Sequence, residues 1–163
     1  MPAGALVAAF VTSAAPASAS GYSDRLSYVF TASDDGNGGL CLDFSGNVVR
    51  NFQPVQIYWC NGTGAQKWVY DYTDRTVRLA ENVGMCLDIN SGQTSNGTTV
   101  DLYQCNGTGA QVWDALSSGS RAWINPQSGK CLDDTKWSTQ PWTQLQIWDC
   151  TGAANQDWYI KLA

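Results

Sequence analysis

Short runs in which apolar and polar residues alternate recur along the chain and are separated by turn residues. The segments Val55-x-Ile57-x-Trp59 and Leu145-x-Ile147 have the two-residue period of half-buried strands. Clusters of Gly and Asn interrupt such runs about every 8 to 12 residues. No stretch keeps a helical apolar period over several turns, so the pattern predicts an all-β fold.

The six cysteines of the 163-residue chain show a repeat with a period of 45 residues. Each member of the first series begins a Cys-Leu-Asp tripeptide, and each member of the second precedes a Gln-x-Trp motif. The first series is Cys41, Cys86 and Cys131, and the second is Cys60, Cys105 and Cys150. A fixed period of this length indicates one supersecondary unit that is used three times.

The period defines three repeats, at about 26–70, 71–115 and 116–160. We expect four short strands in each repeat and about twelve in all. Such a repeat fits a propeller blade, but a propeller needs roughly four blades or more. Three units instead close a barrel capped by hairpins, which leaves no long sheet edge. The prediction is an all-β β-trefoil, with 21–163 as one domain that is large enough for a hydrophobic core.

The even number and regular placing of the cysteines favour a disulfide framework formed in an oxidising compartment. Repeat symmetry removes most of the possible connectivities. Pairing within each repeat closes three loops of equal length, and each such bond contributes about 3 kcal/mol in the chain-entropy model. These pairs are Cys41–Cys60, Cys86–Cys105 and Cys131–Cys150.

The first 20 residues carry no charge, and a short apolar run at 5–11 is followed by small residues at 15–19. This pattern is typical of a secretory signal peptide and is too short for a membrane span. No Lys or Arg precedes the apolar run. We expect 1–20 to be a secretory segment outside the fold, and the protein to be secreted and extracellular.

The formal net charge is −5 and the chain contains no His. A negative charge argues against nucleic acid or an anionic membrane as partner, because both bind through basic patches. Without His the chain lacks the commonest general base and the Ser-His-Asp and Cys-His nucleophile systems. It also lacks a Cys-x-x-Cys zinc motif. We therefore expect no enzymatic activity, no metal, no cofactor and no membrane insertion.

These motifs resemble those of the ricin-type (QxW) β-trefoil lectins and of family 13-like carbohydrate-binding modules. The resemblance covers about 26–160 and depends on three Cys-Leu-Asp, three aromatic-x-Cys and three Gln-x-Trp motifs at one spacing. It implies a non-catalytic domain that binds sugars at up to three shallow pockets, one in each repeat. Such domains are often attached to secreted enzymes that degrade polysaccharides, so a catalytic domain or enzyme is a further expected partner.

The resemblance implies a common set of pocket residues. An Asp accepts hydrogen bonds from neighbouring sugar hydroxyls, an aromatic ring covers the apolar C–H face, and amide side chains both donate and accept. We expect the third repeat to bind most strongly. Its candidates are Asp133, Gln146, Trp148 and Asn155, with Gln156 orienting Asp133 from behind.

The other two repeats are less complete, and we expect the second to bind better than the first. Ala110 and Ala65 stand where the third repeat has Asn155, and Asp101 replaces the pocket Gln in the second repeat. The candidates of the second repeat are Asp88, Asp101, Tyr103 and Gln111. Those of the first are Asp43, Gln56, Tyr58 and Gln66.

Several of these motifs also have a structural interpretation. The glutamines of the Gln-x-Trp motifs could satisfy buried backbone groups, and the aspartates could cap turns. Trp137 and Trp142 occur only in the third repeat, and they either extend a binding surface or fold back on their lobe. We expect three tryptophans, one in each lobe, to fill the core: Trp68, Trp113 and Trp158.

The favoured function is a secreted lectin-like domain that gains avidity on a polysaccharide or glycan with galactose-, xylose- or arabinose-type sugars. One alternative is a protein-binding trefoil, such as an inhibitor or an adhesion or toxin component, with 131–150 as its exposed loop. The other is a glycoside hydrolase, which needs two carboxylates across one bond. Only Asp133-Asp134 and the pair of Asp88 and Asp101 offer a local dyad.

Overall fold

The computed structural model describes residues 27–31, 39–115 and 121–162, and their regular structure is almost entirely β. The predicted secretory segment at 1–20 lies outside these residues. The described strands are β1 (Ser27–Thr31), β2 (Leu40–Phe44), β3 (Gln53–Trp59), β4 (Trp68–Asp71), β5 (Thr76–Leu79), β6 (Asn82–Ile89), β7 (Val100–Gln104), β8 (Ile124–Asn125), β9 (Lys130–Asp133), β10 (Thr143–Gln144), β11 (Gln146–Asp149) and β12 (Trp158–Leu162).

Short 3-10 turns connect many of these strands. They are η1 (Ser45–Asn47), η2 (Gly64–Gln66), η3 (Asn90–Gly92), η4 (Gly109–Gln111), η5 (Thr135–Trp137) and η6 (Ala154–Gln156). None of the helices in the described part of the chain has the length and apolarity to cross a membrane.

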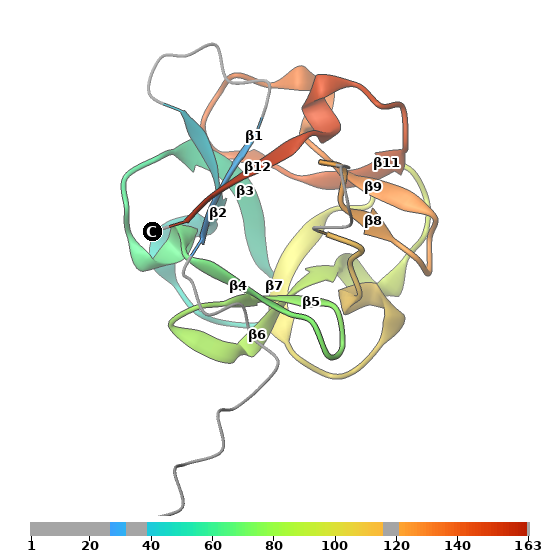
Figure 1. Cartoon of the computed structure of the whole chain (residues 1–163), viewed down its shortest axis with the longest axis horizontal. Coiled ribbons are helices and arrows are strands. Elements are labelled where there is room, and N and C mark those ends of the chain that lie inside the picture. Colours follow the sequence, from blue (N-terminus) through green and yellow to red (C-terminus); the bar gives the residue numbers. More distant parts are fainter. Residues whose placement is uncertain (1–26, 32–38, 116–120, 163) are drawn as a thin grey trace, which may run out of the picture.

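The three repeats occupy three sectors around a common centre (Figure 1). Most strands belong to one curled sheet, in which β1 and β12, from opposite ends of the described chain, pair antiparallel. Neighbouring repeats also pair directly, because β3 bonds to β7 and β10 bonds to β3. A smaller sheet has the order β11-β9-β8. This closed arrangement of three units is the predicted β-trefoil.

Each repeat contains an antiparallel hairpin whose first strand includes its Cys-Leu-Asp motif: β2–β3, β6–β7 and β9–β11. Side chains alternate between the two faces of a strand, so the buried Leu points into the core and the Asp beside it points to the opposite face. The hairpin register then places equivalent residues opposite one another in every repeat. These pairs are Asp43 with Gln56, Asp88 with Asp101, and Asp133 with Gln146.

The expectation of four strands in each repeat is wrong in detail, although the described residues form twelve strands, in line with the expected total. In the second repeat the segment after η4 forms isolated bridges, at Val112 and Asp114, in place of a strand. In the third repeat the strand before Cys150 is divided at the fully buried Leu145, whose N–H donates to the Val55 carbonyl at 2.9 Å. The chain changes its partner there, from β3 to β9.

The three predicted disulfides are confirmed. Each joins the first strand of a hairpin to the end of the second, with a sequence separation of 19 residues and a Cα–Cα distance of 5.1 Å. Each disulfide therefore holds together the two strands of the hairpin that carries a candidate pocket, in the same way in all three repeats. The described part of the chain contains no free cysteine.

The three tryptophans of the Gln-x-Trp motifs are buried in the core, as predicted. Each indole N–H donates to the backbone carbonyl of the Leu in the Cys-Leu-Asp motif of its own repeat, at 3.0 to 3.1 Å. A buried indole N–H needs such a partner. The donors are Trp68, Trp113 and Trp158, and the acceptors are Leu42, Leu87 and Leu132.

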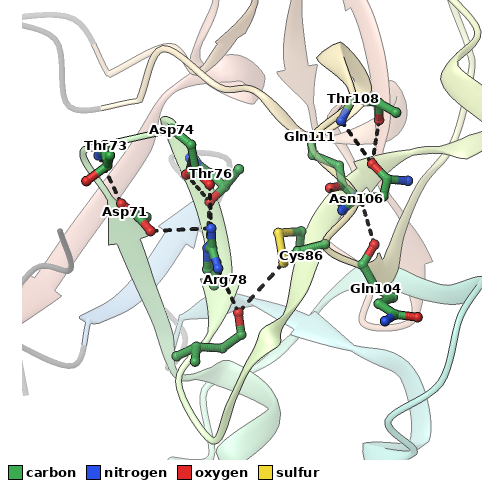
Figure 2. A network of polar contacts seen from close by, with 12 residues as sticks. Asp71, Thr73, Asp74, Thr76, Arg78, Cys86, Gln104, Asn106, Thr108 and Gln111 are labelled. Carbon is green, nitrogen blue, oxygen red and sulfur yellow. Dashed lines mark hydrogen bonds and ion pairs between the residues drawn. A yellow bond between two sulfur atoms is a disulfide. The ribbon is translucent and has the colours of Figure 1, made fainter. Parts of the chain in front are cut away.

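A charged network links β4 and β5 at the start of the second repeat (Figure 2). Arg78 forms ion pairs with Asp71, at 3.3 Å, and with Asp74, and its Nε donates to the Thr76 hydroxyl at 2.7 Å. The Arg78 side chain is largely buried, so its charge needs these carboxylates nearby. This cluster is part of the scaffold and lies outside the three hollows described below.

Candidate functional site

The third repeat surrounds the buried carboxylate of Asp133 with three side-chain amides. Gln146 donates to Oδ1 at 2.8 Å, and Asn155 and Gln156 donate to Oδ2 at 2.8 and 2.9 Å. Asn155 also donates to the carbonyl of Asp134 at 3.2 Å, which fixes its orientation. A carboxylate accepts about four hydrogen bonds, so the described residues leave Asp133 capacity for one more, on Oδ1.

A hollow of about 240 Å³ opens in front of this carboxylate. Trp148 forms one wall and is 41% exposed, while Trp137, from η5, forms another. The site thus combines a fixed acceptor, amides and two exposed indoles. Its lining residues are Asp133, Lys136, Trp137, Gln146, Trp148, Thr151 and Asn155.

The second repeat has a carboxylate that is less well partnered. Asp88 accepts from Gln111 at 2.7 Å, and Asp101 lies opposite it across the hairpin. The pKa of Asp88 is raised to about 6, chiefly by burial; the Gln111 hydrogen bond opposes the shift, and the neighbouring Asp101 carboxylate adds to it. Near neutral pH a larger fraction of Asp88 than of an ordinary aspartate is therefore protonated, and the protonated carboxyl is a weaker hydrogen-bond acceptor.

Asp101 does not line the second hollow. Its carboxylate accepts from Asn90 at 2.6 Å and from Gln144, in the third repeat, at 2.9 Å. Burial raises the pKa of Asp101, and these two hydrogen bonds lower it. The side chain that replaces the pocket Gln thus joins two repeats.

The second hollow is wider, at about 370 Å³. Gly92 occupies the η3 position that corresponds to Trp137, so no indole narrows the space. Tyr103 forms one wall, and Phe52 of the first repeat packs edge-on against it at 4.9 Å between ring centroids. Its lining residues are Phe52, Asp88, Ser91, Gly92, Tyr103, Asn106, Thr108, Ala110 and Gln127.

The first repeat is intermediate in its polar contacts. Asp43 accepts from Gln56 at 2.9 Å and from Gln66 at 3.1 Å. Burial raises the pKa of Asp43, and both amides lower it. The hollow measures about 210 Å³, and besides Asp43, Gln56 and Tyr58 it is lined by Trp142 of the third repeat.

The three glutamines of the Gln-x-Trp motifs lie behind the aspartates and outside the hollows. Gln111 is typical: its Nε2 donates to Asp88, and its Oε1 accepts the Asn106 N–H at 2.8 Å. The same Nε2 also donates to the Gln104 carbonyl at 3.0 Å (Figure 2). Gln66 and Gln156 make the equivalent contacts. These residues orient the carboxylates, and their buried amides are fully used by the protein.

The structure separates the two tryptophans that are unique to the third repeat. Trp137 lines the hollow of its own repeat, whereas Trp142 lines that of the first. Phe52 was not among the residues predicted for a pocket, and Trp142 was expected either to extend a binding surface or to fold back on its own lobe. The available signal was the 45-residue period itself, which places 52, 97 and 142 in equivalent positions of the loop before each second hairpin strand. Motif matching within a repeat does not show which neighbour a loop touches.

Comparison with known proteins identifies the fold and the family. A family model for the ricin-type β-trefoil lectin domain matches residues 31–158. A comparison with curated protein sequences found no match. Among solved structures, the designed threefold-symmetric protein ThreeFoil is 24% identical, with a TM-score of 0.74, over 83% of this chain and 96% of its own.

Two larger proteins contain a similar unit. The exo-β-1,3-galactanase 1,3Gal43A of Clostridium thermocellum has a TM-score of 0.74 and 23% identity, over 86% of this chain and 31% of that one. A non-toxic homologue of type II RIPs from Momordica charantia, solved in complex with α-methyl-D-galactoside, has a TM-score of 0.66 and 26% identity. The match covers 86% of this chain and 48% of that one.

The family match extends over most of the chain and includes all three hairpins, disulfides and Gln-x-Trp motifs. The hollows found in the structure lie at the equivalent place in each of these repeats. The chain therefore belongs to the family of ricin-type β-trefoil lectin domains, and its general function is that of a carbohydrate-binding lectin.

Proposed function

We propose that the chain binds galactose-type sugars without cleaving them, chiefly at the hollow of the third repeat. The observation that carries the proposal is the carboxylate of Asp133, held by three amides directly beside the exposed ring of Trp148. Asp133 and Asn155 contact the hydroxyls of the sugar, and Trp148 covers its C–H face. The predicted order of the pockets, third, second and first, is part of this proposal.

The chemistry of a sugar matches this arrangement. A carboxylate in a charge-assisted hydrogen bond is a stronger acceptor than a neutral oxygen, and vicinal hydroxyls offer it two donors. Amides accept from one hydroxyl and donate to another. Because the amides already hold Asp133 in place, its side chain loses little conformational entropy when a sugar binds.

Galactose is favoured among the expected sugars by one similarity. The Momordica charantia homologue, at 26% identity, was solved with α-methyl-D-galactoside. Xylose- and arabinose-type sugars present comparable hydroxyls and therefore belong in the same test. Selectivity among them depends on the positions of Trp137 and Lys136 at the rim.

Repetition supplies the avidity in this proposal. A millimolar pocket contributes only about 4 kcal/mol. Three hollows on one rigid body, however, engage a polymer or a glycan-coated surface together, because binding at one raises the effective concentration at the others.

Binding without hydrolysis is supported by how the carboxylates are used. A glycosidase needs two carboxyl groups about 5 to 10 Å apart across one bond, one of them protonated. Asp43, Asp88 and Asp133 lie in separate lobes, and Asp101 is bound by Asn90 and Gln144 away from the second hollow. A reducing-sugar assay on galactan, xylan and arabinan tests this point, and turnover that is lost in Asp133→Asn would contradict it.

We further propose that the protein is secreted and acts on extracellular glycans, alone or joined to an enzyme that degrades them. Support comes from the signal-like composition of 1–20 and from the three disulfides, which persist in oxidising compartments. Mass determination of the protein from culture medium tests the proposal. A protein that stays in the cell with 1–20 attached would contradict it.

A glycan array with galactose-, xylose- and arabinose-terminated probes tests the binding function. We expect the strongest signal on galactosides, and its loss in Trp148→Ala. Tyr72→Ala is a suitable control, because Tyr72 is exposed and lies outside the three hollows. An array signal that Trp148→Ala leaves unchanged would overturn the assignment of the third pocket.

A further inference from the structure

One loop position, occupied by Phe52, Gly97 and Trp142 in the three repeats, lies at or beside the hollow of another repeat. Phe52 of the first repeat lines the second hollow, and Trp142 of the third lines the first. Gly97 of the second lies beside Trp148 of the third, and a Cβ on Gly97 would be 3.8 Å from Cζ3 of that indole. The first and second hollows thus include a residue that this loop position of another repeat supplies, whereas at the third hollow the position is a glycine behind one wall.

The side chain of Trp142 is not needed for the backbone contact between this loop and the neighbouring repeat. All three residues have a positive φ, which is 60° at Phe52, 85° at Gly97 and 67° at Trp142. Glycine adopts this conformation freely, whereas a bulky residue is strained in it. Gly97 and Trp142 make the same backbone contact, because their N–H groups donate to the carbonyls of Ile147 and Ile57 at 2.9 Å.

Trp142 instead builds a cluster of three aromatic rings at the mouth of the first hollow. Its ring centroid lies 5.2 Å from that of Tyr58 and 5.2 Å from that of Trp59, and these two are 5.4 Å apart. The contacts are edge-to-face, at 64° to 76°. Trp59 and Trp142 remain 50% and 61% exposed. Large apolar side chains that adjoin one another and stay exposed to water commonly mark a binding surface.

The cluster is continuous with a polar floor. Tyr58 and Trp142 line the same hollow as Asp43 and Gln56. Ala65 stands where the third repeat has the amide of Asn155, so this hollow offers one polar contact fewer to a single sugar. Its aromatic surface is larger, which favours a ligand that extends beyond one ring.

We propose that Tyr58, Trp59 and Trp142 form an aromatic subsite beside the first hollow, so that this site binds two or more linked sugar units. Asp43 and Gln56 hold the first unit, and the exposed indoles cover the C–H face of the second. The inference rests on the proposed lectin function and assigns to the first repeat a different ligand, a glycan chain, from the single sugar of the third.

The eight tryptophans give separate indole N–H signals in a ¹H–¹⁵N correlation spectrum, which allows each hollow to be titrated separately. The probes are methyl α-D-galactoside with β-1,4-galactotetraose, and methyl β-D-xyloside with xylotetraose. At the first hollow, reported by Trp59 and Trp142, we expect one tetrasaccharide to bind about tenfold more tightly than its monosaccharide, because a second sugar ring buries apolar surface on the indoles.

Trp142→Gly removes the indole and keeps the backbone, since Gly suits a φ of 67°. We expect the ratio of chain to monosaccharide affinity, followed at Trp59, to fall close to one. The matched control is Trp137→Gly, at a φ of 56° in the same repeat. That change alters titration of the third hollow, followed at Trp148, and keeps the ratio at the first.

Each result decides the inference. Equal affinity of the first hollow for chain and monosaccharide, no response there to any probe, or an unchanged ratio in Trp142→Gly would overturn it. Lower thermal stability of Trp142→Gly with the ratio intact would make the cluster purely structural. Sugar binding at Trp148 in the same titrations reports on the proposed function separately, so the lectin function can stand while the aromatic subsite fails.

Discussion

The third and second hollows have the same backbone plan, but their buried carboxylates have different partners. In the third, Asp133 is held by Gln146, Asn155 and Gln156. In the second, Asp88 has Gln111 as its amide partner and a second carboxylate across the hairpin. The same scaffold position is therefore a well-stabilised acceptor in one lobe and a carboxyl group with a pKa of about 6 in the other.

This difference shows which substitutions change a pocket without changing the fold. Replacing Asn155 by the equivalent Ala110 removes one donor, and replacing Gln146 by Asp101 turns a donor into a like charge. Neither change alters the hairpin register or the disulfide. Duplicated lobes can thus diverge in ligand while their core stays the same.

The largest expected effect is that of Asp133→Ala. It removes the charged acceptor and deprives the amides of Asn155 and Gln156 of the carboxylate that they bind, so we expect galactoside binding at the third hollow to fall about 100-fold. Isothermal titration with methyl α-D-galactoside measures the change. Asp88→Ala is the matched control, and a greater loss in that variant would reverse the order of the two lobes.

Asn155→Ala converts the third hollow toward the second. The sugar loses one amide and Asp133 loses a hydrogen bond, so we expect affinity for the same galactoside to fall about 20-fold. The melting temperature should change little, because Ala already occupies this position in the other two lobes. Unaltered affinity would mean that Asn155 only supports the backbone of Asp134.

Acid should weaken the second hollow. Asp88 has a folded pKa of about 6, so its ionised fraction, and with it galactoside binding at Tyr103, should fall about tenfold between pH 7 and pH 5. The ¹³C shift of the Asp88 carboxyl carbon measures the midpoint. Asp88→Asn should abolish the pH dependence, and a midpoint near 4 would contradict the role of burial.

The same group gives a stability prediction with a definite sign. Its pKa is raised in the folded state, so between about pH 4 and pH 6 the folded chain binds more protons than the unfolded one. The contribution of Asp88 to the free energy of unfolding therefore increases as the pH falls through this window. Chemical denaturation at pH 7 and pH 5, with Asp88→Asn as reference, measures it.

The smallest effect is expected for Ala110→Asn, which gives the second hollow the amide of the third. The new side chain would donate to Asp88, lower its pKa and strengthen galactoside binding a few-fold. Titration at pH 7 measures the gain. Ala65→Asn in the first lobe is the parallel variant, and no gain in either would show that the Asp134 carbonyl is needed to orient the amide.

Much of the architecture could be predicted from the sequence because it depends on residues that repeat. The 45-residue spacing of Cys, Leu, Gln and Trp predicted three equivalent hairpins, three disulfides and a core tryptophan in each lobe. These features are local: each disulfide closes a separation of 19 residues, and each indole bonds a carbonyl of its own repeat. The pocket aspartates and aromatics follow from the same registers.

Contacts between repeats could not be predicted in this way. Asp101 looked like a pocket residue by alignment, yet Asn90 and Gln144 hold its carboxylate at a junction of two repeats. Trp142 looked like part of the third lobe, yet it packs on Tyr58 and Trp59 of the first. Both outcomes depend on which strands meet across the closed barrel.

The sequence by itself therefore determined the repeat, the strands that carry the aspartates and the identity of the core. Short-range hydrogen bonds and apolar alternation are sufficient for these features. Only the tertiary structure decided how the lobes share their hollows. Closure of the sheet brings a loop of one repeat, in a left-handed backbone conformation, against the pocket of another. The 45-residue period shows which positions are equivalent, but it does not show which repeats are in contact.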